Sequence, residues 1–209
     1  MSGLITLATL PDELSQGYSG RLARSNGFES IIAFEQHLSS NLGGGQGKFD
    51  LPTSKVERLA ETAGMSLRAY VRSHSMLTLW RGVTCTSSER NAERDFYQAL
   101  LTYGVRASRS ALHYCPRCAR ADVLFHGMSY WRREHQIPGV YGCSKHGQPL
   151  SYTDWSNVDR APRSLGEGSQ TSPVLYEIAV DCAAVLRSRE LAHGLMQGGV
   201  KLHVDYVYA

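Results

Sequence analysis

The sequence predicts a mainly α-helical chain that carries a small zinc-ribbon or zinc-finger module and ends in a further helix. Three observations lead to this class. Apolar residues recur at helical spacing in several segments of the first hundred residues. Three cysteines and one histidine follow at ligand spacing, and a long amphipathic segment comes last. We therefore expect an N-terminal helical, helix-turn-helix-like domain, a zinc-binding module, and a linker with a C-terminal helix, at residues 1–88, 89–156 and 157–209.

Two helices are expected near the N-terminus. The first begins at Pro11, because proline in the first turn and acidic residues at the positive end of the helix dipole favour a start there. It runs to about Arg24 and ends at Asn26-Gly27, although Gly17 and Gly20 weaken its helix propensity. The second helix spans residues 29–39, with an apolar stripe formed by Ile31, Ile32, Phe34 and Leu38.

The glycine-rich stretch 41–47 does not indicate a nucleotide site. A phosphate-binding loop needs a preceding strand and a Gly-Lys-Ser/Thr sequence that opens a helix. Here Lys48 follows Gly47, but Phe49 takes the place of the hydroxyl residue. We expect a flexible surface loop.

A helix-turn-helix outline follows this loop. Thr53 caps a helix with an apolar face, Gly64 ends that helix, and Ser66 caps a second helix over 67–74. The second helix carries Arg68 and Arg72, which are candidates for contacts with phosphates or base edges. The same pair also fits a solvated face, or a helix that packs against or docks onto another protein.

Coarser expectations cover the rest of the chain. We expect a helix over 89–103, short strands over 123–127 and 140–142, a turn or helix over 129–135, and a linker or partly ordered loop over 157–173. The amphipathic segment 174–196 predicts a helix whose apolar face includes Cys182 and Leu191. A final strand is expected over 200–208.

The clearest chemical signal is a set of four metal ligands. Cys115 and Cys118 form a C-x-x-C, and Cys143 and His146 form a C-x-x-H after 24 intervening residues. Three thiols and one imidazole complete a tetrahedral Zn²⁺ site with no open position, which favours a structural ion. Two alternatives are a redox C-x-x-C beside an unrelated cysteine, and a disulfide. Three other histidines are rival ligands, namely His113, His126 and His135. None of them is separated from a cysteine by two residues, as a paired ligand would be.

Charge is concentrated around these ligands. Nine Lys or Arg and four Asp or Glu lie between Arg106 and Arg163, in a chain whose net charge is +3. Arg132 and Arg133 are candidates for contact with nucleic acid or a protein partner, whereas the neighbouring Trp131 is expected in the core. The surplus makes this module basic within a nearly neutral chain.

No catalytic constellation is found. The sequence has no Ser/His/Asp order and no paired-carboxylate motif, and a deaminase would need His-x-Glu upstream of its Pro-Cys-x-x-Cys. We therefore expect a protein that is not an enzyme. The unpaired Cys85 and Cys182 suit a reducing compartment, and we find neither a signal peptide nor a stretch of transmembrane length, so we expect a cytoplasmic location.

Taken in order, these motifs resemble the TniQ family. The resemblance covers about residues 7–150 and rests on the following segments: Leu10-Pro11-Asp12-Glu13-Leu14, Gly20-Arg21-Leu22-Ala23-Arg24-Ser25-Asn26, Met76-Leu77-Thr78-Leu79, Tyr114-Cys115-Pro116-Arg117-Cys118, Tyr130-Trp131 and Cys143-Ser144-Lys145-His146-Gly147-Gln148-Pro149-Leu150. Many members carry further cysteines soon afterwards, which residues 151–155 do not, and many are longer. This chain resembles the short members linked to CRISPR-associated transposons, or the core of a longer one.

The resemblance implies a transposition adaptor. Such proteins link a target-recognising element, either a DNA site or a CRISPR effector with its guide RNA, to a TnsC-type AAA+ ATPase that recruits the transposase. Basic residues near the knuckles would neutralise phosphates of target DNA, and we select Arg117, Arg120, Arg132, Arg133 and Lys145. The N-terminal helical unit is the expected docking surface for the ATPase. The competing hypothesis is a stand-alone DNA-binding transcriptional regulator with a helix-turn-helix and a zinc ribbon.

Overall fold

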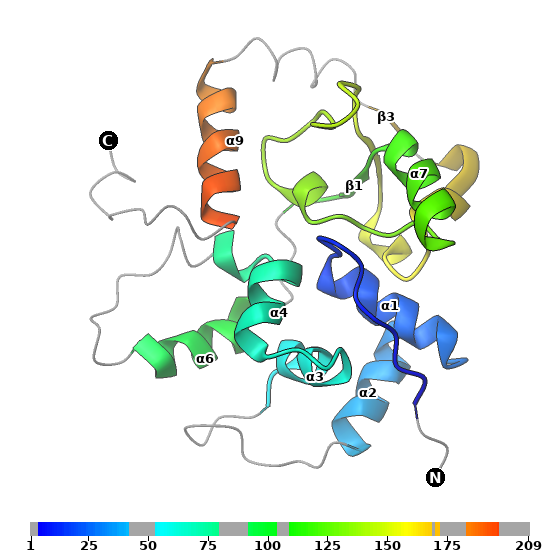
Figure 1. The fold of residues 1–209 in the computed structure, drawn as a ribbon, viewed down its shortest axis with the longest axis vertical. Helices are drawn as coiled ribbons and strands as arrows, with labels where there is room; N and C mark the ends of the chain where they lie inside the picture. Colours follow the sequence, from blue (N-terminus) through cyan, green and yellow to red (C-terminus); the bar gives the residue numbers. More distant parts are fainter. Residues whose placement is uncertain are drawn as a thin grey trace.

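The computed structural model describes residues 4–41, 53–79, 92–103, 109–168, 170–171 and 183–196. Helices dominate this part of the chain, which confirms the predicted mainly α class. Figure 1 shows the N-terminal helices in one half of the molecule, and a smaller half with a short sheet above them. One cluster of buried apolar side chains lies within the first half, and a second joins the smaller half to Leu14, Met76 and Leu79. None of the described helices is both long and apolar enough to cross a bilayer.

Five helices build the first half. They are α1 (Ser15–Ser25), α2 (Ile31–Asn41), α3 (Lys55–Thr62), α4 (Leu67–His74) and α6 (Ala92–Tyr103). Their inward faces form one cluster, which contains Tyr18, Leu22, Phe34, Leu38, Val56, Leu59, Tyr70, Val71, Phe96 and Leu100. Helix α6 thus packs with the N-terminal helices. The exact division of the chain into domains stays a prediction.

The predicted helix pair agrees closely with α3 and α4. Gly64 has a φ of +66°, a left-handed conformation that favours glycine and ends α3. The Ser66 hydroxyl then accepts a hydrogen bond from the backbone N–H of Ala69, at 3.3 Å, and begins α4. The cap of α3 differs from the prediction, because Ser54 rather than Thr53 accepts a bond from the N–H of Glu57, at 3.1 Å.

The start of α1 was predicted four residues too early. Pro11, Asp12 and Glu13 form a turn instead, and Leu14 is the residue that precedes the helix. The Glu13 carboxylate accepts a bond from the N–H of Leu10, and the Glu13 N–H donates to the carbonyl of Leu10. Asp12 takes a left-handed φ of +56°. The acidic residues therefore hold a turn in place, and do not form the first turn of a helix.

The second half contains a three-stranded antiparallel sheet. Its strands are β1 (Leu112–Tyr114), β2 (Ser151–Thr153) and β3 (Gln170–Thr171), in the order β1-β2-β3. Helix α7 (Pro116–His126) follows β1, and three short 3₁₀ helices complete the half: η3 (Glu134–Gln136), η4 (Trp155–Asn157) and η5 (Pro162–Gly168). The stretch 157–173, for which we expected a linker or partly ordered loop, carries η5 and β3.

The strand predicted over 123–127 is wrong, since these residues lie in α7 and its C-terminal cap. Pro116 stands in the first turn, where its missing N–H costs nothing. The Cys115 thiol caps the helix, and Gly127 ends it with a φ of +74°. Predicted turn structure over 129–135 agrees with a bridge at Arg132 followed by η3. Only an isolated bridge, between Gly142 and Pro149, forms where a strand over 140–142 was expected.

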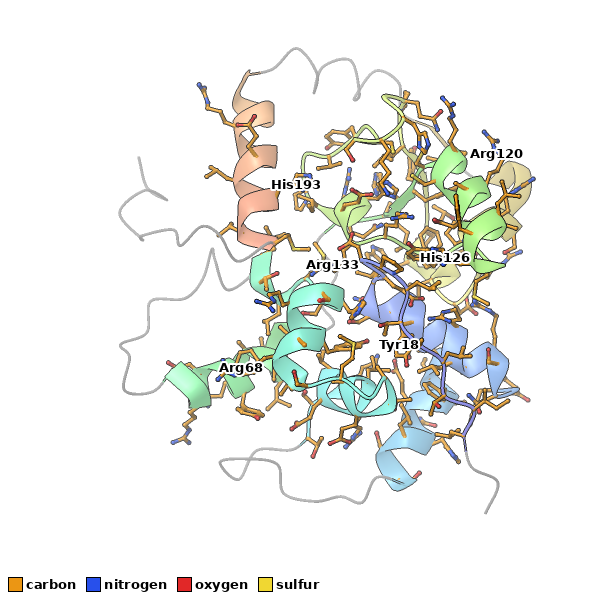
Figure 2. The ribbon with its side chains drawn as sticks, viewed as in Figure 1. Tyr18, Arg68, Arg120, His126, Arg133 and His193 are labelled. Atoms are coloured by element: carbon orange, nitrogen blue, oxygen red, sulfur yellow. The ribbon has the colours of Figure 1, made fainter. Side chains whose placement is uncertain are left out.

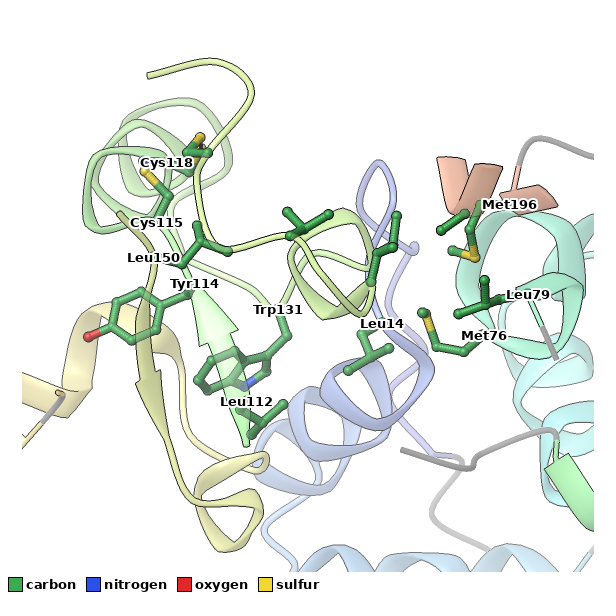
Figure 3. Close-up of a cluster of buried hydrophobic side chains, with 14 of the residues drawn as sticks. Leu14, Met76, Leu79, Leu112, Tyr114, Cys115, Cys118, Trp131, Leu150 and Met196 are labelled. Atoms are coloured by element: carbon green, nitrogen blue, oxygen red, sulfur yellow. Dashed lines mark hydrogen bonds between the residues drawn. The ribbon is translucent and has the colours of Figure 1, made fainter. Parts of the chain in front are cut away.

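The two halves meet where α1 passes Trp131. The N–H of Leu14 donates to the carbonyl of Trp131 at 2.8 Å, and both side chains lie in the second buried cluster (Figure 3). A Cβ at Gly17 would lie 2.9 Å from the Trp131 ring, so only glycine allows this approach. A Cβ added at Gly20 would likewise lie 2.7 Å from the Cα of Asp159. Close packing therefore explains both helix-weakening glycines, and Trp131 is in the core, as predicted.

Helix α9 (Ala183–Met196) packs through its last turns. Ala192, Leu195 and Met196 join the same buried cluster as Met76 and Leu79. Leu191 was expected on the apolar face but is 46% exposed, because the buried face of α9 is formed by Ala192, Leu195 and Met196. Cys85, Cys182, the glycine-rich loop beyond residue 41 and the expected strand over 200–208 lie outside the described residues.

Candidate metal centre

Two backbone turns bring the four predicted ligands together. Cys115 follows β1 and precedes α7, which places Cys118 in the first turn of that helix. On the other side, the N–H of Gly147 donates to the carbonyl of Cys143, and the N–H of Cys143 donates to the carbonyl of Gln148, both at 2.9 Å. Gly147 adopts a φ of +56°, which the tight turn requires. This turn directs the side chains of Cys143 and His146 toward Cys115 and Cys118.

The spacing of the ligand atoms fits one tetrahedral ion. Cys118 Sγ and Cys143 Sγ are 3.6 Å apart, and His146 Nδ1 lies 3.3, 3.4 and 3.5 Å from the three sulfur atoms. Zn–S and Zn–N bonds of typical length at a tetrahedral angle would give about 3.8 Å between sulfurs and about 3.6 Å from sulfur to nitrogen. All four atoms lie within 4.8 Å of one another. These four residues can therefore hold a metal ion.

The distances argue against the disulfide alternative. A disulfide would bring two sulfur atoms to about 2.05 Å, whereas Cys115, Cys118 and Cys143 are all free and buried. The redox alternative, with an unrelated third cysteine, also disagrees with the geometry, because Cys143 is part of the same cluster.

The hydrogen bonds among the three thiols favour ionisation of one of them, Cys115, and not of all three together. Hydrogen bonds from the Cys118 and Cys143 thiols hold the pKa of Cys115 far below its usual range. The hydrogen bond with Cys115 raises the pKa of Cys118, and it likewise raises the pKa of Cys143. The side-chain amide of Gln148 also donates to Cys115 Sγ, at 3.1 Å. A divalent cation would supply the charge that lets all three thiols ionise together.

The rival histidines lie outside the described cluster. His113 bonds to the carbonyl of Ala111 through Nδ1 and stacks on Tyr152, and burial lowers its pKa to about 4. His135 is 2% exposed, and burial lowers its pKa to about 3. His126 is exposed at the end of α7. The preference for His146 agrees with the cluster.

Sequence reasoning missed the residue that supports the second ligand pair. Arg109 Nη1 donates to the carbonyls of His135, Ile137 and Val140, which form the segment before Cys143. Its guanidinium also lies 4.7 Å from the Tyr141 ring, and burial lowers its pKa to about 10. Since these partners are backbone carbonyls and Tyr141, which lie 26 to 32 residues later, no local sequence pattern could have identified this role.

The basic residues selected from the sequence fall into two groups. Arg117, Arg120 and Lys145 are exposed around the ligand cluster, and Arg68 and Arg72 are exposed on α4. The guanidinium of Arg68 lies 5.3 Å from the Phe96 ring centre. Figure 2 shows Arg68 and Arg120 on separate halves of the molecule.

Arg132 and Arg133 are engaged inside the protein. Arg132 pairs with the buried Asp122, and its side chain is 12% exposed. Arg133 pairs with Asp12 at 2.8 Å, and Nη1 donates to the carbonyls of Arg72 and Ser75. The expectation that these two guanidinium groups meet nucleic acid therefore has no support. The partners of Arg133 lie 58 to 121 residues away in the sequence, and Asp122 lies ten residues before Arg132 on another element, so the basic pair by itself suggested a surface role.

The fold and site together define a class: a mainly helical protein whose second half contains a Cys₃His cluster that can hold a metal ion. The chain belongs to the TniQ family, whose model matches residues 4–150 and so spans both the helical core and all four ligands. Among curated proteins, it is similar to the transposon Tn7 transposition protein TnsD of Escherichia coli. The two are 25% identical over 140 residues, which cover 60% of this chain and 28% of that protein. The chain thus spans little more than a quarter of that relative's length.

Proposed function

We propose that this chain is a non-enzymatic target-selection adaptor in DNA transposition. It links a target-recognising element, either a DNA site or an RNA-guided CRISPR effector, to a TnsC-type AAA+ ATPase and so to the transposase. The observation that carries the proposal is the family match over residues 4–150, which includes the helical core and the metal ligands in one unit. The similarity to TnsD, a transposition protein, supports the same role.

The metal in this proposal is structural Zn²⁺ held by Cys115, Cys118, Cys143 and His146. Three thiolates and an imidazole are a ligand set that zinc prefers, and four protein ligands leave no position for a catalytic water. The ion would hold α7 against the knuckle turn at Gly147, in a half that has only a short sheet. Reduced thiols suit the reducing cytoplasm.

Target DNA would meet the exposed basic side chains. Arg117, Arg120 and Lys145 surround the metal centre, and Arg68 and Arg72 lie on the second helix of the predicted helix-turn-helix. Each side chain that neutralises a phosphate adds to the salt dependence of binding. We expect charge removal on α4 to weaken binding to duplex DNA. It should also reduce the salt slope by about one for each phosphate that is no longer neutralised.

Co-elution tests this function. The full chain is mixed with the AAA+ ATPase from its own locus, with ATP and duplex DNA, and again with each omitted. A complex that needs ATP and DNA is the expected result. Tight, sequence-specific DNA binding without any ATPase complex would instead favour the stand-alone regulator, for which the capped α3–α4 pair is the supporting observation.

A further inference from the structure

Gln148 contacts the metal ligands with both its backbone and its side chain. Its carbonyl accepts a hydrogen bond from the N–H of Cys143 at 2.9 Å, which closes the turn of the second ligand pair. Its side-chain amide donates to Cys115 Sγ at 3.1 Å, and Cys115 belongs to the first pair, 33 residues earlier. A residue that is not itself a ligand therefore joins the two ligand pairs.

The backbone around Gln148 is held in place by hydrogen bonds of its own. The next residue, Pro149, forms an isolated antiparallel bridge with Gly142. The N–H of Leu150 then donates to the carbonyl of Tyr141 at 2.8 Å. A residue that precedes proline is also restricted in its backbone conformation. Because the backbone is already fixed, only the side-chain rotamers of Gln148 lose freedom when its amide reaches the ligand.

The chemistry of the sulfur sets the direction of this hydrogen bond. Cysteine binds a metal ion as a thiolate, which has no proton to donate and can only accept. The amide nitrogen of Gln148 carries two N–H groups, and it is this nitrogen that faces Cys115 Sγ. A hydrogen bond to an ionised acceptor is roughly twice as strong as one between neutral groups. The contact is therefore stronger when the thiolate is bound to a metal ion.

Backbone groups supply other hydrogen bonds to the sulfur atoms. Two N–H groups of its own turn donate to Cys143, and the N–H of Cys118 donates to Cys115 Sγ at 3.5 Å. These bonds arise from the ligand turns themselves. The bond from Gln148 to Cys115 is shorter and comes from a side chain. A single substitution therefore removes it and leaves the backbone of both turns in place.

We propose that Gln148 is a positioning residue of the metal centre, whose amide holds Cys115 against the second ligand pair and stabilises its thiolate. Gln148 thereby sets how tightly the centre retains Zn²⁺. This inference rests on the structural zinc of the proposed function, and it adds a residue that lies outside the C-x-x-C and C-x-x-H motifs. Groups that orient metal ligands typically account for about a tenfold to hundredfold difference in metal affinity.

Zinc affinity and the electronic spectrum of the Co²⁺-loaded protein test this role, both with the full chain. Q148L removes the donor and keeps a side chain of similar size, whereas Q148E keeps the length and places a carboxylate beside the sulfur. The control is Q36L, since Gln36 is exposed on α2. Competition with a chelator of known affinity measures zinc binding, and the cobalt spectrum gives the energy of the sulfur-to-metal charge-transfer band.

We expect Q148L to bind zinc about tenfold more weakly than the wild type. Q148E should bind zinc more weakly still, because its carboxylate repels the thiolate. In both variants the charge-transfer band should move to longer wavelength, because the lost hydrogen bond no longer lowers the energy of the sulfur electrons. Q36L should match the wild type in both measurements.

Wild-type zinc affinity in Q148L would overturn the role of Gln148 and leave the structural zinc intact. A loss of affinity with an unchanged charge-transfer band would also overturn it, because the residue would then act only through the turn. If Q148L does not fold, the band of Q148E decides in the same way. A wild-type chain that binds neither zinc nor cobalt would remove the metal centre and the role of Gln148 together.

Discussion

The buried ion pair between Glu13 and Arg21 offers a sharp test of how this fold is stabilised. The Arg21 guanidinium meets the carboxylate through two bonds, Nε to Oε1 at 3.0 Å and Nη2 to Oε2 at 2.8 Å. The Glu13 side chain is fully buried and that of Arg21 is 7% exposed. Burial nevertheless raises the pKa of Glu13, against the lowering effect of Arg21. The desolvation cost of the carboxylate is therefore larger than the attraction that offsets it.

This balance predicts strongly non-additive mutations. Changing Glu13 to Leu leaves the Arg21 charge buried without its partner, which should cost about 3–5 kcal/mol, and changing Arg21 to Met should cost about as much. The double variant removes both charges. It still leaves the N–H of Leu10 and the carbonyl of Ala8 without their side-chain partners, at about 1 kcal/mol each. We expect the double variant to be destabilised by about 2 kcal/mol in total, less than either single variant.

Urea unfolding of the zinc-loaded chain measures these changes. The control is Lys55→Met, which breaks a more exposed ion pair with Glu35 and should cost less than about 1 kcal/mol. If the destabilisation of the double variant equals the sum of the two single values, the two charges do not compensate each other. The reasoning from burial would then be refuted.

Three further predictions concern the metal centre and the contact between the halves. Cys115→Ser should abolish stoichiometric zinc binding and unfold the second half, as measured by metal analysis and circular dichroism, and retention of both would contradict a structural role. Gly17→Ala should cost about 1–3 kcal/mol in urea unfolding, because the new Cβ meets the Trp131 ring, and an unchanged midpoint would show that the ring moves aside freely. The pKa of His135 is lowered from 6.5 to about 3, so the unfolded chain binds one more proton between these values and stability falls as pH drops below about 6.5. His135→Gln should reduce this slope by about 1.4 kcal/mol per pH unit, and an equal slope in the variant would contradict a neutral buried imidazole.

Local signals predicted those parts of the fold whose causes are local. Gly64 ends α3 with a left-handed turn, and two residues later Ser66 caps the start of α4. The four ligands were recognisable because two residues between paired ligands let a short turn direct both at one ion. Neither prediction depended on contacts with other parts of the chain.

The errors arose where distant residues decide the structure. The acidic residues at 12 and 13 resemble a helix start, yet Glu13 pairs with Arg21 and Asp12 pairs with Arg133, 121 residues later. Val123 to Phe125 resembles a strand because of its apolar character. These residues instead lie in the last turns of α7, the helix whose first turn is capped by the thiol of Cys115. Cysteine is not among the usual capping residues, so the sequence pattern did not indicate that a helix begins after Cys115. Leu124 and Phe125 are exposed at the end of α7, whereas a strand in the core would have buried them.

The contacts of Arg133 suggest why one family match spans both halves. Arg133 belongs to the half that contains the Cys₃His cluster, yet its guanidinium donates to the carbonyls of Arg72 in the last turn of α4 and of Ser75, the C-cap residue. Carbonyls at a helix C-terminus lack partners within the helix, and a cation there also interacts favourably with the helix dipole. The second half thus caps the helix that carries the exposed Arg68 and Arg72. The N–H of Arg133 also donates to the carbonyl of Asp12, in the turn before α1. Through Arg133, the half that carries the Cys₃His cluster is thus hydrogen-bonded both to the turn before α1 and to the end of the basic helix α4.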